Sequence, residues 1–350
     1  MTEESVIISR EGSLGRLHLN RPKAINSLTL EMVRLIDKGL TEFEGDDSIA
    51  SVLITGEGER GLCAGGDIIA LYESGKAKTP DAERFWAEEY VLNARIADYP
   101  KPYVAFMDGI TMGGGVGVSA HGGHRIVTDR TRLAMPETGI GFFPDVGGTW
   151  ILGRAAGEVG TYIGLTGASF GAADAIYAGF ADSYMPAGKL GDLIAALAGL
   201  PAGAGGAEVD AAIKALAEDA PGATIAENRA AIDAAFAADT VEEIIAALEA
   251  QGTEFAQKTL KTLGQKSPTS LKITLGLLRA ARGSKDLKEC LDREFAATGL
   301  ILEGPDFYEG VRAAVIDKDR NPTWVPATLA EAKAPDLAAL AAAHDTLFNS

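Results

Sequence analysis

Two carboxylates stand in an otherwise apolar segment that glycine and proline interrupt. The segment covers residues 133–148, and its two acids are Glu137 and Asp145. Because Met, Ile and Phe flank these acids, we expect both side chains to be partly removed from water, which raises a carboxyl pKa. A buried carboxylate of this kind is a candidate nucleophile or general base. The alternatives are a helix or turn cap for Glu137 and a helix N-cap for Asp145.

Two glycine-rich turns precede this segment. The first covers residues 62–68 and follows an apolar run, and the second contains the triplet Gly113-Gly114-Gly115, followed by small and β-branched residues. The second pattern predicts a tight loop that enters a buried helix. The first N–H groups of a helix lack partners inside it, and they bind anions or the oxygen of a polarised carbonyl. Two such turns can place two backbone donors around one oxygen.

Together these segments resemble the crotonase (enoyl-CoA hydratase/isomerase) superfamily and, within it, the 3-hydroxyisobutyryl-CoA hydrolase subfamily. The superfamily resemblance rests on residues 19–28, residues 63–67 and the glycine triplet, in that order. The subfamily resemblance rests on residues 88–90, 135–138, 143–148, 306–313 and 316–319. Hydratases of the superfamily use two glutamates; this chain has Gly117 at the first position and keeps the second as Glu137. It carries Asp145 where hydratases usually have a small residue.

The resemblance implies an α/β fold, a crotonase-like spiral of ββα units with a C-terminal helical region. It also implies hydrolysis of a short 3-hydroxyacyl-CoA thioester, like 3-hydroxyisobutyryl-CoA, to the free acid and CoA, as in valine catabolism. The N–H groups of Gly66 and Gly114 would then stabilise the oxyanion. Glu137 would act as nucleophile or general base, with Asp145 as its partner.

The resemblance also suggests residues that bind substrate. Glu89 would contact the 3-hydroxyl group, although a Glu-Glu pair on an amphipathic helix is often a solvated face or an ion pair. Both Asp145 and Glu137 would contact the acyl group beside Gly114. The CoA contacts would come from the N-terminal motif and from the first glycine turn, namely Lys23, Ala24, Ala64, Asp67 and Ile68. We interpret Asp67 as a structural acceptor of a hydrogen bond rather than as a catalyst.

Two other functions stay open on the sequence. The first is a lyase or isomerase that acts on enoyl-CoA, which Gly117 disfavours because glycine offers no acid or base. The second is a non-catalytic acyl-CoA-binding or assembly protein, which the retained Glu137 and Asp145 disfavour.

Hydrophobic patterns predict the elements that position these residues. A hairpin is expected over residues 6–19, a helix follows Thr29, and buried strands are expected at 51–55, 103–107 and 124–128. An amphipathic helix over residues 81–97 carries Glu89. From about residue 161 the pattern is helical. We predict a catalytic core over residues 1–200 and a helical region over 201–350 that packs on it, joined by a low-complexity linker at 201–207.

Composition excludes several classes of function. The 350 residues carry a formal charge of −17, which provides no basic surface for nucleic acid, and no apolar stretch is long enough to span a membrane. The four histidines do not cluster, so we expect no metal, and we expect no cofactor because CoA is part of the substrate. Two distant cysteines are expected to be reduced thiols in the core. The expected partners are the acyl-CoA substrate and, in a homo-oligomer, further copies of the chain; the acidic start without an apolar leader predicts a cytoplasmic location.

Overall fold

A computed structural model describes residues 4–348. The chain forms two compact units, and each is assembled from several segments. Unit 1 contains the residues up to 66 together with 91–133 and 170–223; unit 2 contains 67–90, 134–169 and the residues from 224 onward. Each unit therefore draws residues from both sides of position 200, where we had placed the domain boundary.

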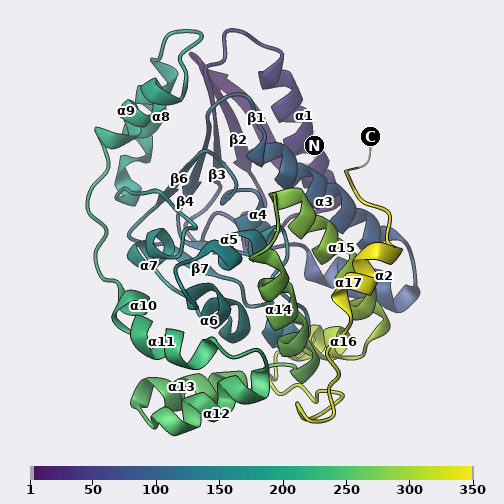
Figure 1. Cartoon of the computed structure of the whole chain (residues 1–350). Helices are drawn as coiled ribbons and strands as arrows, with labels where there is room; N and C mark the ends of the chain where they lie inside the picture. The colour runs from purple at the N-terminus through teal and green to yellow at the C-terminus, as the bar shows by residue number, and fades with distance from the viewer. Residues whose placement is uncertain (1–3, 349–350) are drawn as a thin grey trace. The chain divides into compact units, whose positions relative to one another are not determined.

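Unit 1 is built on a six-stranded sheet with the order β1-β2-β3-β4-β6-β8 (Figure 1). The β1 and β2 strands form the predicted antiparallel hairpin, and the remaining neighbours are parallel. A second sheet pairs β5 with β7. The bounds are β1 Val6–Glu11, β2 Leu14–Leu19, β3 Ser51–Gly56, β4 Tyr103–Met107, β5 Ile110–Met112, β6 His124–Val127, β7 Arg132–Ala134 and β8 Ser183–Tyr184.

The central strands β3 and β4 are buried and strongly apolar, and helices cover the sheet. Helix α1 (Leu30–Glu44) begins after Thr29, whose hydroxyl accepts a hydrogen bond from the Met32 N–H at 3.2 Å, as predicted. Helices α8 (Leu190–Ala198) and α9 (Gly206–Lys214) pack leucine, valine and isoleucine side chains against strand residues such as Leu53 and Val104. The predicted linker at 201–207 thus joins two helices of the same unit. The shorter helices of this unit are α4 (Gly114–Gly117), α7 (Ala172–Tyr177), and the 3-10 turns η1 (Pro22–Ala24) and η3 (Ala187–Lys189).

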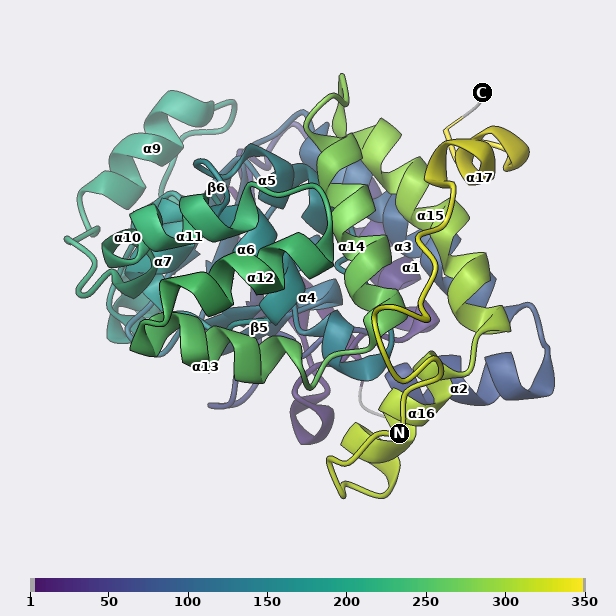
Figure 2. The ribbon, with the colours of Figure 1, turned by 60° about the horizontal axis from the view of Figure 1, so that its bottom comes forward.

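Unit 2 is helical, which confirms the helical pattern predicted for the second half of the chain. Helix α14 packs against α5 and α6, and α11, α12 and α13 follow one another side by side (Figure 2). Helix α3 (Asp81–Ala97) starts in this unit and ends in unit 1, with the predicted bounds. The others are α2 Ile68–Ala77, α5 Gly148–Arg154, α6 Val159–Thr166, α10 Thr224–Glu227, α11 Arg229–Phe236, α12 Val241–Gln251, α13 Glu254–Leu263, α14 Pro268–Ala281, α15 Leu287–Glu303, α16 Asp306–Val311, α17 Leu337–Ala343, the 3-10 turn η2 Glu137–Ile140 and the π-helical turn η4 Arg312–Ile316.

The structure also bears on the predictions about the cysteines and about membrane-spanning segments. Both cysteines, Cys63 and Cys290, are free and buried, as expected for reduced thiols in the core. Among residues 4–348, no helix is both long and apolar enough to cross a membrane.

Candidate active site

The two glycine-rich turns of unit 1 lie side by side. The Cys63 N–H donates to the Ile110 carbonyl at 3.1 Å, and the Met112 N–H donates back to the Cys63 carbonyl at 3.0 Å. An ideal Cβ on Gly65 would stand 3.9 Å from the Gly114 nitrogen. No hydrogen bond from the N–H of Gly66 or Gly114 occurs within residues 4–348. Unit 1 therefore holds two neighbouring turns with backbone donors that the protein itself does not use.

Glycine is required at these turns because the backbones approach closely. A Cβ on Gly115 would lie 2.4 Å from the Cys63 carbonyl oxygen, and Gly113 has a φ of 47°. The loop enters a buried helix as predicted, but α4 has only four residues, Gly114–Gly117. Its residues are three glycines and one valine, so no side chain of α4 can serve as an acid or base.

The residues expected to contact CoA lie in two segments, the first glycine-rich turn and η1. The Ala64 N–H donates to the Ile25 carbonyl at 2.9 Å, which fastens the turn to the segment after Ala24. Lys23 and Ala24 are exposed in η1. Asp67 occupies the N-cap position of α2 without making a side-chain cap, and Ile68 is the first residue of that helix.

Unit 2 buries a cluster of four carboxyl groups. Glu89 lies on α3, Glu137 opens η2, Asp145 lies in the loop before α5, and Glu294 lies on α15. Their exposed fractions are 2%, 6%, 5% and 0%. Burial penalises the charged form of each group, so it is the largest cause that raises each pKa above its ordinary value.

Asp145 is held by a tyrosine rather than acting as a helix cap. The Tyr90 hydroxyl donates a hydrogen bond to Asp145 Oδ2 at 2.7 Å. Burial raises the pKa of Asp145 to about 7, although the Tyr90 hydrogen bond lowers it in part. The alternative of an N-cap is wrong, because α5 begins at Gly148 and Gly147 is its N-cap. A carboxyl group with this pKa can hold or release a proton near neutral pH.

Glu294 takes the capping role that the sequence had suggested for Asp145. It accepts hydrogen bonds from the Gly147 N–H at 2.7 Å, from the Thr149 N–H at 3.1 Å and from the Thr149 hydroxyl. Burial raises the pKa of Glu294 to about 8, against the effect of these bonds. Our sequence analysis missed this residue. The sequence could have revealed it, because Glu294 falls at the helical spacing of apolar residues that form the buried face of α15, namely Cys290, Leu291, Ala297 and Ile301.

Glu137 and Glu89 each keep a buried oxygen without a hydrogen-bond partner. These atoms are Glu137 Oε2 and Glu89 Oε1. Burial and then the charge of Asp145 raise both pKa values well above the ordinary range. Glu137 is the first residue of η2, and Pro136 occupies the N-cap position before it. Glu89 is neither on a solvated face nor in an ion pair, so that alternative is wrong. Both oxygens are free to bind a ligand.

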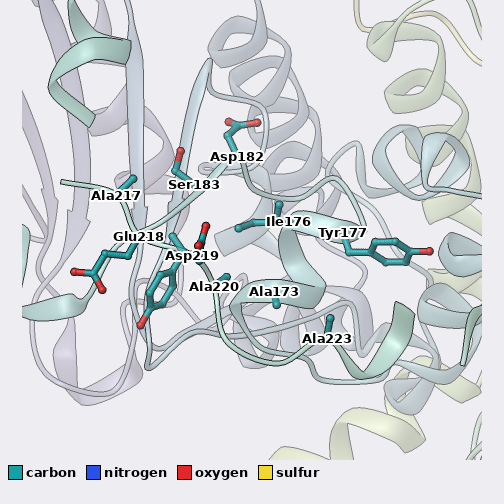
Figure 3. A pocket seen from close by; sticks show the side chains of 11 residues that line it. Ala173, Ile176, Tyr177, Asp182, Ser183, Ala217, Glu218, Asp219, Ala220 and Ala223 are labelled. Atoms are coloured by element: carbon teal, nitrogen blue, oxygen red, sulfur yellow. The ribbon is translucent and has the colours of Figure 1, made fainter. Parts of the chain in front are cut away.

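A separate pocket of unit 1 does not suit an anionic ligand. It measures about 490 Å³ and lies beside Tyr177 and Ser183 (Figure 3). The charged residues of its lining are Asp182, Glu218 and Asp219. Asp182 pairs with Arg125 and Glu218 with Lys189, at 2.5 and 2.7 Å. Although these ion pairs neutralise two of the three acids, the lining contains no basic side chain that could bind the phosphates of CoA.

Comparison with known proteins assigns the family. Residues 14–340 match the family model described as enoyl-CoA hydratase/isomerase. The chain belongs to this family. It is 43% identical over 337 residues to the rat protein named "3-hydroxyisobutyryl-CoA hydrolase, mitochondrial", which covers 95% of this chain and 87% of that protein. The human protein of the same name is 41% identical, with the same coverage of both chains.

Two solved structures of the family share the fold over nearly the whole chain. A carnitinyl-CoA dehydratase from Mycobacterium thermoresistibile is 48% identical with a TM-score of 0.90, covering 97% of this chain and 96% of its own. An enoyl-CoA hydratase from Rhodobacter sphaeroides 2.4.1 is 42% identical with a TM-score of 0.87, covering 97% of both. The predicted crotonase-like α/β fold is thereby confirmed. The rat and human relatives are thus named hydrolases, whereas the two solved structures are named a dehydratase and a hydratase.

Proposed function

We propose that this protein hydrolyses a short 3-hydroxyacyl-CoA thioester, such as 3-hydroxyisobutyryl-CoA, to the free acid and CoA. One observation carries the proposal: Gly117 removes the first hydratase glutamate, whereas Asp145 adds a buried carboxyl group that Tyr90 holds at 2.7 Å. The identity of 41–43% to rat and human 3-hydroxyisobutyryl-CoA hydrolases supports it. Within this proposal the protein is an acyl-CoA thioester hydrolase of valine catabolism.

In this proposal the glycine turns polarise the thioester. The N–H groups of Gly66 and Gly114 donate hydrogen bonds to the carbonyl oxygen, and these bonds strengthen as that oxygen becomes negative. Removal of one such donor costs about 3–4 kcal/mol of barrier in other enzymes. Neither N–H has a protein acceptor within the described residues 4–348, which supports this role.

Glu137 promotes cleavage of the activated thioester by one of two routes. As a nucleophile it forms a mixed anhydride and releases the CoA thiolate, which takes up a proton; water then hydrolyses the anhydride. As a general base it removes a proton from the water that attacks the thioester. Asp145 supplies or accepts the proton in either route, because its pKa of about 7 lets both of its protonation states exist at neutral pH.

Glu89 gives the proposed enzyme its preference for hydroxylated acyl groups. Its buried Oε1 lacks a partner and would accept a hydrogen bond from the 3-hydroxyl group. An acyl group without that hydroxyl leaves the oxygen unsatisfied, at a cost of about 1–3 kcal/mol. Lys23, Ala24, Ala64, Asp67 and Ile68 are proposed to contact the CoA moiety.

The remaining expectations keep the status of proposals. We propose that the reaction needs no metal or other cofactor, since CoA arrives with the substrate, and that the chain forms a homo-oligomer. The cytoplasm stays our prediction for the compartment, while the names of the rat and human relatives place those proteins in mitochondria.

The decisive experiment compares two activities of the same preparation. Release of free CoA from 3-hydroxyisobutyryl-CoA is followed with a thiol reagent, and hydration of crotonyl-CoA is followed by the loss of enoyl absorbance. We expect rapid hydrolysis and negligible hydration. A hydration rate equal to the hydrolysis rate would favour the second candidate, an enoyl-CoA hydratase, which is the name of the similar solved structure from Rhodobacter sphaeroides 2.4.1. Binding of acyl-CoA with neither activity would indicate a non-catalytic protein.

A further inference from the structure

Lys266 stands beside the turn that carries Glu137. The residue lies between α13 and α14 and is partly buried. Its neighbour Ser267 donates its backbone N–H to the Thr138 carbonyl at 3.1 Å, which fixes this segment to η2 one residue after Glu137. Ser267 is fixed in turn, because its hydroxyl donates to Asp306 Oδ2 at 2.5 Å.

Two glycines make room for the ammonium group of Lys266. An ideal Cβ on Gly139 would stand 3.3 Å from Lys266 Nζ, and one on Gly167 would stand 3.2 Å from it. Gly139 is two residues after Glu137, and the same Cβ on Gly167 would approach Pro136 Cα at 3.0 Å. The ammonium group therefore lies beside Gly139, two residues after Glu137, and beside Gly167, which itself approaches Pro136.

No side chain of the described residues neutralises this ammonium group. Within residues 4–348 it forms neither a hydrogen bond nor an ion pair. Other charged side chains on the helices that pack against η2 have partners elsewhere. Lys272 pairs with Glu242, Arg279 with Glu158, and Arg312 with Glu309, Asp317 and Asp319, while Asp306 accepts bonds from Ser267 and Val325.

From this arrangement we propose that Lys266 is a positioning residue whose positive charge favours the ionised form of Glu137 in the hydrolysis proposed above. Glu137 faces the carboxyl groups of Asp145 and Glu294, and each of their negative charges opposes its ionisation. The positive charge of Lys266 acts in the opposite direction and lowers the pKa of Glu137. A nucleophile or general base must be deprotonated, so the lysine extends activity to lower pH. This inference rests on the proposed function.

The test is the pH dependence of kcat/KM in Lys266→Met, which keeps the length of the side chain and removes its charge. The acid limb of the profile, where Glu137 gains its proton, should move to higher pH by about one unit. At a pH below the limb the variant should therefore be about tenfold slower, and at high pH it should recover most of the wild-type rate. The matched control is Lys258→Met, a change of an exposed lysine on α13, which should leave the profile in place.

Restoring the charge separates electrostatics from packing. Lys266→Arg should return the acid limb to its wild-type pH. If the larger group does not fit between the glycines, Lys266→Cys treated with bromoethylamine restores an ammonium at nearly the original position, while the native Cys63 and Cys290 are buried. Thermal unfolding of each variant verifies the fold.

The possible outcomes separate a failure of the Lys266 proposal from a failure of the proposed function. An acid limb that stays in place in Lys266→Met, or that stays shifted after the ammonium is restored in a folded protein, overturns the role of Lys266. If the wild-type protein releases no CoA from any 3-hydroxyacyl-CoA, the proposed function fails, whatever the variants do.

Discussion

Asp145→Asn should change the pH dependence of stability while it abolishes thioester cleavage. The pKa of Asp145 is about 7 in the folded protein, against an ordinary value of 3.8. The folded state thus holds this proton more tightly than the unfolded state. Its contribution to the free energy of unfolding is complete below about pH 3.8 and is lost as the pH rises to about 7. Between pH 5 and 7 the loss is two pH units at about 1.4 kcal/mol each, or about 3 kcal/mol.

Asparagine keeps the shape of the side chain and can still accept the Tyr90 hydrogen bond, but it has no proton to lose. With about 2 cal/mol/K of unfolding entropy per residue, 3 kcal/mol corresponds to about 4 °C in this chain. The Tm of the wild-type protein should therefore fall by about 4 °C more than that of Asp145→Asn between pH 5 and 8.5. Calorimetry at both pH values measures this difference.

The control for this experiment is Asp239→Asn, a change of an exposed carboxylate before α12. Asp239 is exposed and lies outside the buried carboxyl cluster, so its replacement should leave the pH dependence of stability unaltered. If wild type and Asp145→Asn lose the same Tm, the buried carboxyl group does not hold its proton to neutral pH, and the electrostatic reasoning about the site is refuted.

Three further substitutions test the site. Glu137→Gln should lower thioester cleavage by about 10²-fold or more, since it removes the base or nucleophile but keeps the shape; turnover above a tenth of wild type would exclude that role. Glu89→Ala should lower kcat/KM for 3-hydroxyisobutyryl-CoA far more than for isobutyryl-CoA, whereas equal losses would assign Glu89 to the helix or to the CoA contacts. Gly117→Glu should not raise crotonyl-CoA hydration to the rate of hydrolysis, because Gly117 is buried and the added carboxyl group would be removed from water; efficient hydration with an intact fold would contradict this.

Local patterns predicted most of the elements of the fold. The hairpin, the helix after Thr29, the buried strands and the helix over residues 81–97 follow from hydrophobic spacing and from a capping residue. The division into two units could not be predicted in this way. It depends on which helices pack together, such as α14 on α5 and α6, which are more than a hundred residues apart in the sequence. The amino-acid composition changes near residue 200, but residues 170–223 on both sides of that position pack in the same unit.

The candidate site also has residues that local sequence patterns could predict and residues that only the tertiary structure reveals. Glu137 and Asp145 stood out because they interrupt an apolar segment, and both are buried. The groups that set their protonation were not evident, because they come from distant parts of the chain: Tyr90 from α3, Lys266 from the segment before α14, and Glu294 from α15. A pattern can mark a carboxylate as buried, but its pKa depends on charges and donors that tertiary structure brings near.

The burial of four carboxyl groups makes physical sense as a compromise between stability and chemistry. Each group disfavours its own ionised form, and Asp145 raises the pKa of Glu89, Glu137 and Glu294 further. A cluster selected only for stability would replace them with apolar residues of similar volume. Yet the pKa values of about 7 at Asp145 and about 8 at Glu294 allow both groups to exchange a proton close to neutral pH. The neighbouring Glu137 has an oxygen, Oε2, without a hydrogen-bond partner among the described residues. Since a solvated carboxyl group near its ordinary pKa holds almost no proton at that pH, burial is what makes these groups useful for proton transfer.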